Sequence, residues 1–153
     1  VTIGGTALSV ASTHFESGNT PGLDLLRAAQ ARELVSSFPS DRPGILVGDL
    51  NDSPGSPMYQ VLAAANFADV WGSLRPGQPG FTCCEVADLS NPKPLLNQRL
   101  DYVWARLNSR RPRLNGEIER IGAEPGDRIV GPAFKIWPSD HAGLVSVLKM
   151  IEK

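Results

Sequence analysis

Apolar and polar residues alternate over the first thirteen positions and predict a short β-hairpin. Ile3, Leu8 and Val10 lie on the two sides of Gly4-Gly5, a dipeptide that favours a tight turn between strands. The chain begins inside this pattern, without an initiator methionine. A strand at residue 1 would have no preceding partner, so we expect the sequence to continue a longer polypeptide.

A stripe of apolar residues predicts an amphipathic helix over residues 23–38. Its members recur at the i, i+3, i+4 and i+7 spacing of one helix face. They are Ala31, Leu34, Val35 and Phe38. Asp24 lies in the first turn, where the helix dipole favours a carboxylate, and Pro39 ends the helix.

The other apolar runs predict strands at residues 44–48, 100–105 and 144–148 and a second helix at residues 57–65. Ser56 is a suitable cap for this helix, and proline is favoured at its first position.

The stretches between these elements show no clear period. Residues 67–71 are expected to form a short connection or strand, and residues 72–98, rich in glycine and proline, to be irregular. Residues 106–128 are expected to be a polar segment, and Arg128 to Val130 to begin a short extended stretch. Together the elements predict a layered α/β (α+β) fold without a repeat or a domain linker.

The composition is that of an ordinary globular protein. The 153 residues are 41% hydrophobic and 20% charged, and the net charge is −1. A dedicated nucleic-acid binder usually has an excess of basic residues, so binding of long polyanions by charge alone is not supported. No apolar run approaches the length of a membrane span, and the sequence indicates no cellular location.

The two cysteines, Cys83 and Cys84, are adjacent. Neighbouring residues rarely reach good disulfide geometry with each other, and without a CxxC pair the spacing does not predict a zinc site. We therefore interpret both cysteines as structural residues.

Four short polar motifs stand at the ends of predicted strands, where a rigid scaffold can aim loop residues. They are Ser12-Thr13-His14-Phe15-Glu16, Val47-Gly48-Asp49-Leu50-Asn51-Asp52, Gln98-Arg99-Leu100-Asp101-Tyr102-Val103-Trp104 and Pro138-Ser139-Asp140-His141-Ala142-Gly143-Leu144. Both histidines of the chain fall inside them. In an extended segment Asp49 and Asn51 would point the same way and could hold water, Mg²⁺ and phosphate together.

Each motif also has a purely structural interpretation. His14 could be a surface histidine after a strand, and Asp49 could form an Asx turn. Arg99 and Asp101 could pair on an exposed face, and Asp140 could cap a turn. The four motifs gain weight together because each implies the same chemistry.

We find a resemblance to the endonuclease/exonuclease/phosphatase superfamily in the series Thr13-His14, Gly48-Asp49-Leu50-Asn51, Arg99-Leu100-Asp101-Tyr102 and Ser139-Asp140-His141. The superfamily includes pancreatic deoxyribonuclease, abasic-site endonucleases, neutral sphingomyelinases and inositol polyphosphate phosphatases. The match runs from about residue 7 to residue 148. The segment Gly80-Phe81-Thr82-Cys83-Cys84 is also similar to one in bacterial members of uncertain substrate.

The resemblance implies catalytic roles for five residues. Asp49 would position or deprotonate the attacking water, Asn51 would hold a phosphate oxygen, and His14 would contact the phosphate. Asp101 would bond to His141 and stabilise its imidazolium form, so that His141 faces the scissile phosphate. Substrate would therefore be bound by His14, Asn51 and His141.

The resemblance also implies a divalent metal. The expected ion is Mg²⁺, with Mn²⁺ or Ca²⁺ as alternatives, and its ligands in this chain would be Asp140, Asp49 and Asn51. Mg²⁺ keeps several waters, so a sparse ligand set is expected. The implied activity is hydrolysis of a phosphoester, most reasonably a phosphodiester, and the substrate class (nucleic acid, phospholipid or small phosphoester) stays open.

The sequence departs from the family pattern at its start. The family's N-terminal half supplies an early Asn and a metal-binding Glu, whereas Glu16 and Glu33 follow the first matched motif and cannot take that place. The family fold is a four-layer αββα sandwich with mixed, mainly antiparallel sheets. We therefore expect residues 1–153 to be the C-terminal portion of one such domain, lacking the N-terminal half and exposing apolar surface.

Other candidates are weaker. Trp71, Trp104 and Trp137 are expected in the core, although Trp137 could border the cleft. An arginine-rich segment is expected to be a solvated basic loop rather than a substrate contact. Its arginines are Arg106, Arg110, Arg111, Arg113 and Arg120. The alternative function is a non-catalytic fragment or member of the fold that binds phosphate or a protein partner.

Overall fold

The computed structural model describes residues 1–107 and 114–149. The first two strands, β1 (Thr2–Ile3) and β2 (Thr6–Ala7), form the antiparallel hairpin that the sequence predicts. Arg110, Arg111 and Arg113 lie outside the described residues, so the predicted basic loop is covered only at its two ends.

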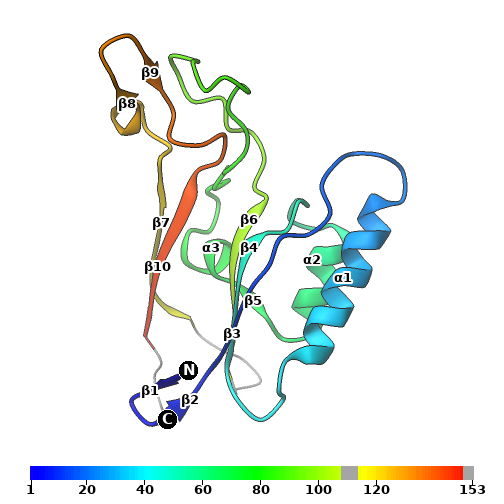
Figure 1. Cartoon of the computed structure of the whole chain (residues 1–153). Helices are drawn as coiled ribbons and strands as arrows, with labels where there is room; N and C mark the ends of the chain where they lie inside the picture. The colour runs from blue at the N-terminus through cyan, green and yellow to red at the C-terminus, as the bar shows by residue number, and fades with distance from the viewer. Residues whose placement is uncertain (108–113, 150–153) are drawn as a thin grey trace.

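A four-stranded mixed sheet forms the centre of the molecule. Its order is β3 (Ser9–Ser12), β4 (Gly44–Asp49), β6 (Asp101–Arg106) and β5 (Ala68–Asp69). β3 runs parallel to β4, and β4 and β5 run antiparallel to β6. Figure 1 shows β4 and β6 at the centre of the molecule.

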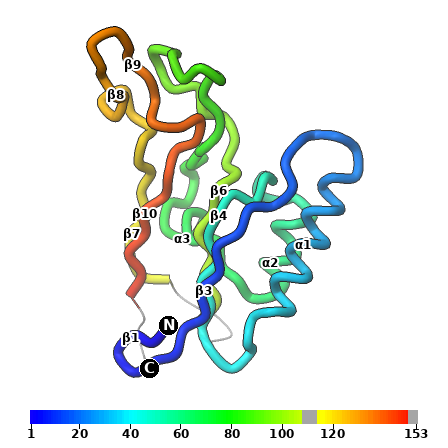
Figure 2. Tube along the Cα trace, viewed as in Figure 1, coloured from blue at the N-terminus to red at the C-terminus, as the bar shows by residue number. Residues whose placement is uncertain are grey.

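Two helices cover one face of this sheet. They are α1 (Leu23–Ser37) and α2 (Pro57–Ala64), and the predicted apolar stripe of α1 packs into the core. Ser56 caps α2 as expected, since its Oγ accepts a hydrogen bond from the backbone N–H of Tyr59. From the sheet, Leu46, Tyr102 and Trp104 point into the same core. The same layers can be followed along the Cα trace in Figure 2.

The opposite face of the sheet carries a second apolar cluster. It contains α3 (Val70–Leu74) and Ile118 of β7 (Asn115–Ile121), which pairs over seven residues with β10 (Gly143–Lys149). A groove of about 730 Å³ remains between this ladder and the sheet. Its lining is mainly apolar and includes Ile45, Val47, Val103, Leu144 and Leu148.

The polar segment over residues 106–128 contains the strand β7, which was not predicted. β7 has few apolar residues, and within it only Ile118 is buried. Its strand conformation is stabilised by the non-local ladder with β10, which local polarity does not reveal. Of the connection or strand expected over 67–71, the strand is confirmed as β5, whereas α3 begins at its last two residues.

A small hairpin projects beyond the β7–β10 ladder. It consists of β8 (Ile129–Val130), which confirms the predicted extended stretch, and β9 (Lys135–Ile136), preceded by a 3-10 turn at Pro125–Asp127. All three tryptophans are buried as expected, and Trp137 is fully buried rather than lining a cleft. No helix in the described ranges combines the length and apolarity needed to cross a bilayer.

Candidate active site

The carboxylates of Asp49 and Asp101 come from neighbouring strands and stand opposite each other. The antiparallel register of β4 and β6 pairs these two residues directly. Opposed residues of antiparallel strands project from the same face of a sheet. Asp49 follows Ile45 and Val47 along β4 in alternation, so both carboxylates belong to the face that carries the groove.

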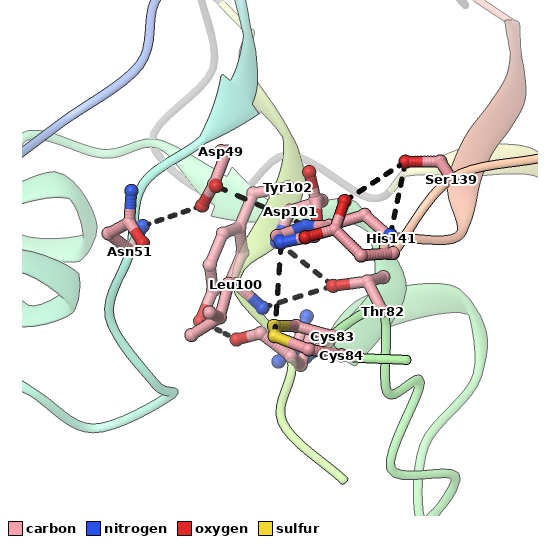
Figure 3. Close-up of polar contacts among 12 residues, drawn as sticks. Asp49, Asn51, Thr82, Cys83, Cys84, Leu100, Asp101, Tyr102, Ser139 and His141 are labelled. Carbon is pink, nitrogen blue, oxygen red and sulfur yellow. Dashed lines mark hydrogen bonds and ion pairs between the residues drawn. A yellow bond between two sulfur atoms is a disulfide. The ribbon is translucent and has the colours of Figure 1, made fainter. Parts of the chain in front are cut away.

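Asn51 reaches the site through a turn rather than through an extended strand. β4 ends at Asp49, and Asn51 has φ 51°, in the left-handed region. The backbone N–H of Asn51 donates to Asp49 Oδ1 at 2.8 Å, so the Asx turn is real. The expectation that extended geometry aligns the two side chains is therefore wrong, yet the turn still places the amide beside the carboxylate (Figure 3).

His14 is brought to Asp49 by the continuation of β3. The Thr13 N–H donates to the carbonyl of Val47 and the Phe15 N–H to that of Asp49, so the chain follows β4 to its end. His14 Nε2 lies 2.8 Å from Asn51 Nδ2 and 3.5 Å from Asp49 Oδ2. The His14 side chain is 68% exposed, which leaves it accessible to a substrate.

Gly48 permits this close approach. It has φ 140°, and a Cβ there would lie 1.8 Å from the carbonyl oxygen of Thr13. No side chain fits at that distance. The motif Gly48-Asp49-Leu50-Asn51 thus needs glycine at its first position for a steric reason. The absence of a side chain lets the segment that carries His14 lie against β4.

His141 contacts both carboxylates through Nδ1. The distances are 2.8 Å to Asp101 Oδ2 and 4.0 Å to Asp49 Oδ2. Burial alone lowers the pKa of His141, but the hydrogen bond and charge of Asp101, with the charges of Asp49 and Asp140, more than offset it, and the pKa is raised. The imidazolium form is therefore favoured by the surrounding carboxylates.

The pKa of Asp49 is shifted in the direction expected of a proton acceptor. Burial raises its pKa, and the Asp101 carboxylate adds to this, whereas the Asn51 backbone N–H and the two histidines oppose the rise. A carboxylate with a raised pKa is a stronger base than an exposed one. The arrangement can therefore both hold a positive imidazolium and accept a proton.

Asp140 lies beside these residues but is turned toward its own loop. It is exposed, and its Oδ1 accepts a hydrogen bond from Ser139 Oγ at 3.3 Å. Two groups of potential metal ligands occur within the described residues: Asp49 with Asp101 and His141, and Cys83 with Cys84 and His141. Neither includes Asp140 or a glutamate.

Thr82 was not singled out from the sequence, although it fixes the floor of the site. Its buried Oγ1 accepts hydrogen bonds from the backbone N–H groups of Leu100 and Asp101, both at 3.1 Å. Its carbonyl accepts a hydrogen bond from the N–H of Ala142. Thr82 thereby ties β6 to the His141 loop. A single threonine in an irregular stretch gives no periodic signal that could have revealed this role.

The adjacent cysteines also belong to this floor. Cys83 and Cys84 form a vicinal disulfide, so the expectation that they would not pair is wrong. Cys83 forms single β-bridges to both Gln98 and His141, and the segment is held in place on both sides. Cys84 Sγ lies 3.9 Å from His141 Nε2 (Figure 3).

Arg99 is part of the support rather than of the reacting face. It forms two hydrogen bonds to the carboxylate of Asp69, at 2.8 and 2.7 Å, and both residues are buried. The interpretation of Arg99 and Asp101 as a pair on an exposed face is therefore wrong. Among the arginines of the expected basic loop, Arg106 donates to the carbonyl of Pro39 and Arg120 to that of Phe81, so both serve structural contacts.

Comparison with known proteins decides the family. A model of the endonuclease/exonuclease/phosphatase family matches residues 8–141, which is most of the chain. The chain belongs to this family. Its mixed sheets and flanking helices agree with the family fold. No curated protein sequence matches the chain significantly.

Solved structures share the fold at low sequence identity. D. rerio TDP2 complexed with single strand DNA product is 20% identical, with a TM-score of 0.65, over 97% of this chain and 59% of that one. Beta toxin from Staphylococcus aureus is 23% identical, with a TM-score of 0.63, over 97% of this chain and 55% of that one. An endonuclease/exonuclease/phosphatase family protein from Leptotrichia buccalis is 18% identical, with a TM-score of 0.65, over 98% of this chain and 52% of that one. The chain thus spans little more than half of their length.

Proposed function

We propose that the chain is the C-terminal portion of a Mg²⁺-dependent hydrolase of phosphodiester bonds. The convergence of Asp49, Asp101 and His141 carries this proposal, since their ligand atoms lie within 4.8 Å of one another. His14 and Asn51 adjoin Asp49 on its other side. Phosphoryl transfer needs a positioned water and positive charge around the phosphate, and these side chains can contribute to both.

Asp49 is the proposed acceptor of the water's proton. Its Oδ1 is held by the Asn51 N–H, which leaves Oδ2 to take the proton as the water oxygen bonds to phosphorus. Its raised pKa suits this role. Asp101 acts indirectly, because it orients His141 through Nδ1 and stabilises its positive charge.

The two histidines are the proposed contacts to the non-bridging oxygens. His141, in its imidazolium form, would donate a hydrogen bond to the phosphate from Nε2, and the exposed His14 would approach from the Asn51 side. Donors fixed in advance stabilise charge that develops in the transition state.

The residues present could supply part of the coordination shell of a Mg²⁺ ion. Asp49 supplies a half-buried carboxylate, Asn51 an amide oxygen, and the exposed Asp140 a second carboxylate nearby, whereas Asp101 is already paired with His141. Mg²⁺ prefers such oxygen ligands and retains waters. When bound, it would supply further positive charge to the phosphate. The family's chief metal-binding glutamate would come from the N-terminal half.

The apolar groove supports a second proposal, which is that the N-terminal half of the domain packs against this chain. Ile45, Val47 and Val103 of the sheet line it, together with Leu144 and Leu148 of β10. In a sandwich fold such faces are covered by a second sheet. We propose that the N-terminal half of the domain packs here and completes the metal shell beside Asp49.

A reconstitution experiment tests the proposal. The chain, joined to or mixed with the N-terminal half of its domain, is expected to cleave a generic phosphodiester such as bis-p-nitrophenyl phosphate with Mg²⁺ and to lose this activity with EDTA. Asp41→Asn is a matched control, because Asp41 pairs with Arg42 just before the opposite end of β4. Absence of cleavage by the folded, reconstituted domain would favour the non-catalytic alternative.

Substrate identity is a separate proposal. The structure of D. rerio TDP2 holds a single strand DNA product, but the net charge of −1 gives this chain no general attraction to long polyanions. A short phosphodiester is therefore the favoured substrate class. Rates on an oligonucleotide, a phospholipid and a small diester compared in parallel would decide between the classes.

A further inference from the structure

The vicinal cysteines and His141 bring three potential soft-metal ligands together. The Sγ atoms of Cys83 and Cys84 and a ring nitrogen of His141 all lie within 4.8 Å of one another. The distance from Cys84 Sγ to His141 Nε2 is 3.9 Å. In a tetrahedral zinc site, bonds of about 2.3 Å to sulfur and about 2.0 Å to nitrogen separate such a pair by about 3.6 Å. The Cys84–His141 distance is therefore close to that of a bound pair, whereas the two sulfurs, which are bonded to each other here, must separate to about 3.8 Å to share one ion.

The backbone holds these ligands in position without the metal. The Cys83 N–H donates to the carbonyl of Gln98, whose own N–H donates to the carbonyl of Cys83. An antiparallel bridge joins Cys83 to His141, and the N–H of Glu85 donates to the carbonyl of Asp140. The two short segments are therefore fixed to one another on both sides of the ligand group.

The other nitrogen of His141 is arranged as in many metal sites. Nδ1 lies 2.8 Å from Asp101 Oδ2, which leaves Nε2 as the nitrogen that faces the sulfurs. A histidine that binds a metal commonly donates its second N–H to a carboxylate, which fixes the tautomer and strengthens the ligand. Cys84 is exposed, so an ion can enter from solvent, while Cys83 is buried.

We propose that the reduced Cys83–Cys84 pair, with His141 Nε2, binds one thiophilic divalent cation of the Zn²⁺ or Cd²⁺ class. This site differs from the proposed Mg²⁺ site in its ligands, because thiolate and imidazole select soft ions and carboxylate oxygens select hard ones. Three protein ligands leave a fourth position for water. The sequence alone did not indicate such a site, because His141 is distant from the cysteines in the chain.

The site exists only after the disulfide is opened. A phosphine reductant gives two electrons to the S–S bond, which breaks into two thiols, while the phosphine takes oxygen from water and is released as phosphine oxide. The two protons of that water protonate the sulfurs. Each thiol then loses its proton to solvent when it bonds to the ion. Occupation of Nε2 would also withdraw His141 from a phosphate, and this consequence alone rests on the proposed function.

Titration of the full chain with Cd²⁺ tests the site without any activity assay. After reduction by a phosphine and its removal, the chain is expected to bind one Cd²⁺ with a thiolate charge-transfer band in the ultraviolet. The oxidised chain should show no such band, and excess Mg²⁺ should not displace the ion. His141→Ala should weaken binding by at least about tenfold, and Asp101→Asn by about tenfold to a hundredfold.

His14→Ala is the matched control, because His14 is the second of the two histidines and adjoins Asp49 without belonging to the group of Cys83, Cys84 and His141. Its Cd²⁺ affinity should equal that of the unmodified chain. A reduced chain without the band, or equal affinity in His141→Ala and the unmodified chain, would overturn the proposal. Cys84→Ser should abolish the band. If that variant does not fold by circular dichroism, the comparison of reduced and oxidised wild-type chain decides the question.

Discussion

The carboxylate of Asp101 lies 2.8 Å from Nδ1 of His141, although forty residues separate them in the sequence. The contact exists because Thr82 fastens the backbone of Asp101 on one side and that of Ala142 on the other. The pair therefore depends on the tertiary structure, and its effect on His141 can be measured directly.

Replacement of Asp101 by Asn should lower the pKa of His141. Burial favours the neutral ring, and the Asp101 hydrogen bond and charge, with the charges of Asp49 and Asp140, outweigh it. Without the Asp101 charge the balance shifts toward the neutral form. A titration followed by NMR of the imidazole protons gives the value, with His14→Ala used to assign the signals. An unchanged pKa of His141 would show that Asp101 does not control its charge.

The same pair should make stability depend on pH in a defined direction. A histidine whose pKa is raised on folding stabilises the native state fully below its unfolded pKa of about 6.5. That contribution is lost as the pH rises through the folded pKa. The loss of unfolding free energy in Asp101→Asn should therefore be larger near pH 6 than near pH 9. Urea denaturation at both values measures it, and an equal loss at both would contradict the account.

Substitution of Gly48 by Ala should destabilise the fold strongly. The new Cβ would lie 1.8 Å from the Thr13 carbonyl oxygen, and φ is 140°. A cost above about 3 kcal/mol is expected, since backbone strain and a steric clash combine. Gly55→Ala is the control, because φ there is also positive (90°) but nothing lies within 4 Å of the Cβ position. Similar midpoints of urea unfolding for the two variants would refute the steric argument.

The buried Arg99–Asp69 pair should be costly to break from one side. Arg99→Met leaves the Asp69 carboxylate buried without its guanidinium partner, although the Tyr59 hydroxyl still donates to it, and a loss of about 3–5 kcal/mol is expected. The exposed Arg42–Asp41 pair provides the comparison, where Arg42→Met should cost far less than Arg99→Met, because solvent screens the exposed pair. Chemical denaturation of both variants measures the difference.

The groove should bind apolar probes in the isolated chain. Ile45, Val103 and Leu144 line it, together with residues of the β1–β2 hairpin. We expect ANS fluorescence to rise with the chain alone and to fall when the N-terminal half of the domain is added. A compact monomer of these 153 residues that unfolds cooperatively in calorimetry and binds no ANS would count against the need for a second half.

Local patterns predicted α1 from its apolar stripe, α2 from its cap and proline, and the central strands β4 and β6 from short apolar runs. The stripe of α1 and the apolar runs of β4 and β6 are confirmed in the packed core. β7 escaped prediction because only Ile118 is buried there and the strand depends on pairing with β10. A local apolar pattern carries no information about pairing with a strand that is far away in the sequence.

The candidate site was foreseeable in its residues but not in its geometry. His14, Asp49, Asn51, Asp101 and His141 were selected from four short motifs, and they converge. The opposition of the two aspartates comes from strand register, which single motifs do not encode. Thr82 and the vicinal disulfide were missed because their roles arise from contacts with chain-distant segments.

The central claim is that Asp49 and His141 act together on a phosphodiester. The most direct test is kcat/KM of the reconstituted domain with Mg²⁺ for three variants: Asp49→Ala, His141→Ala and the control Asp41→Asn. The first two should lose about a thousandfold, or about 4 kcal/mol of transition-state stabilisation, and the control should match the unmodified domain. Full activity in either Asp49→Ala or His141→Ala would contradict the assignment.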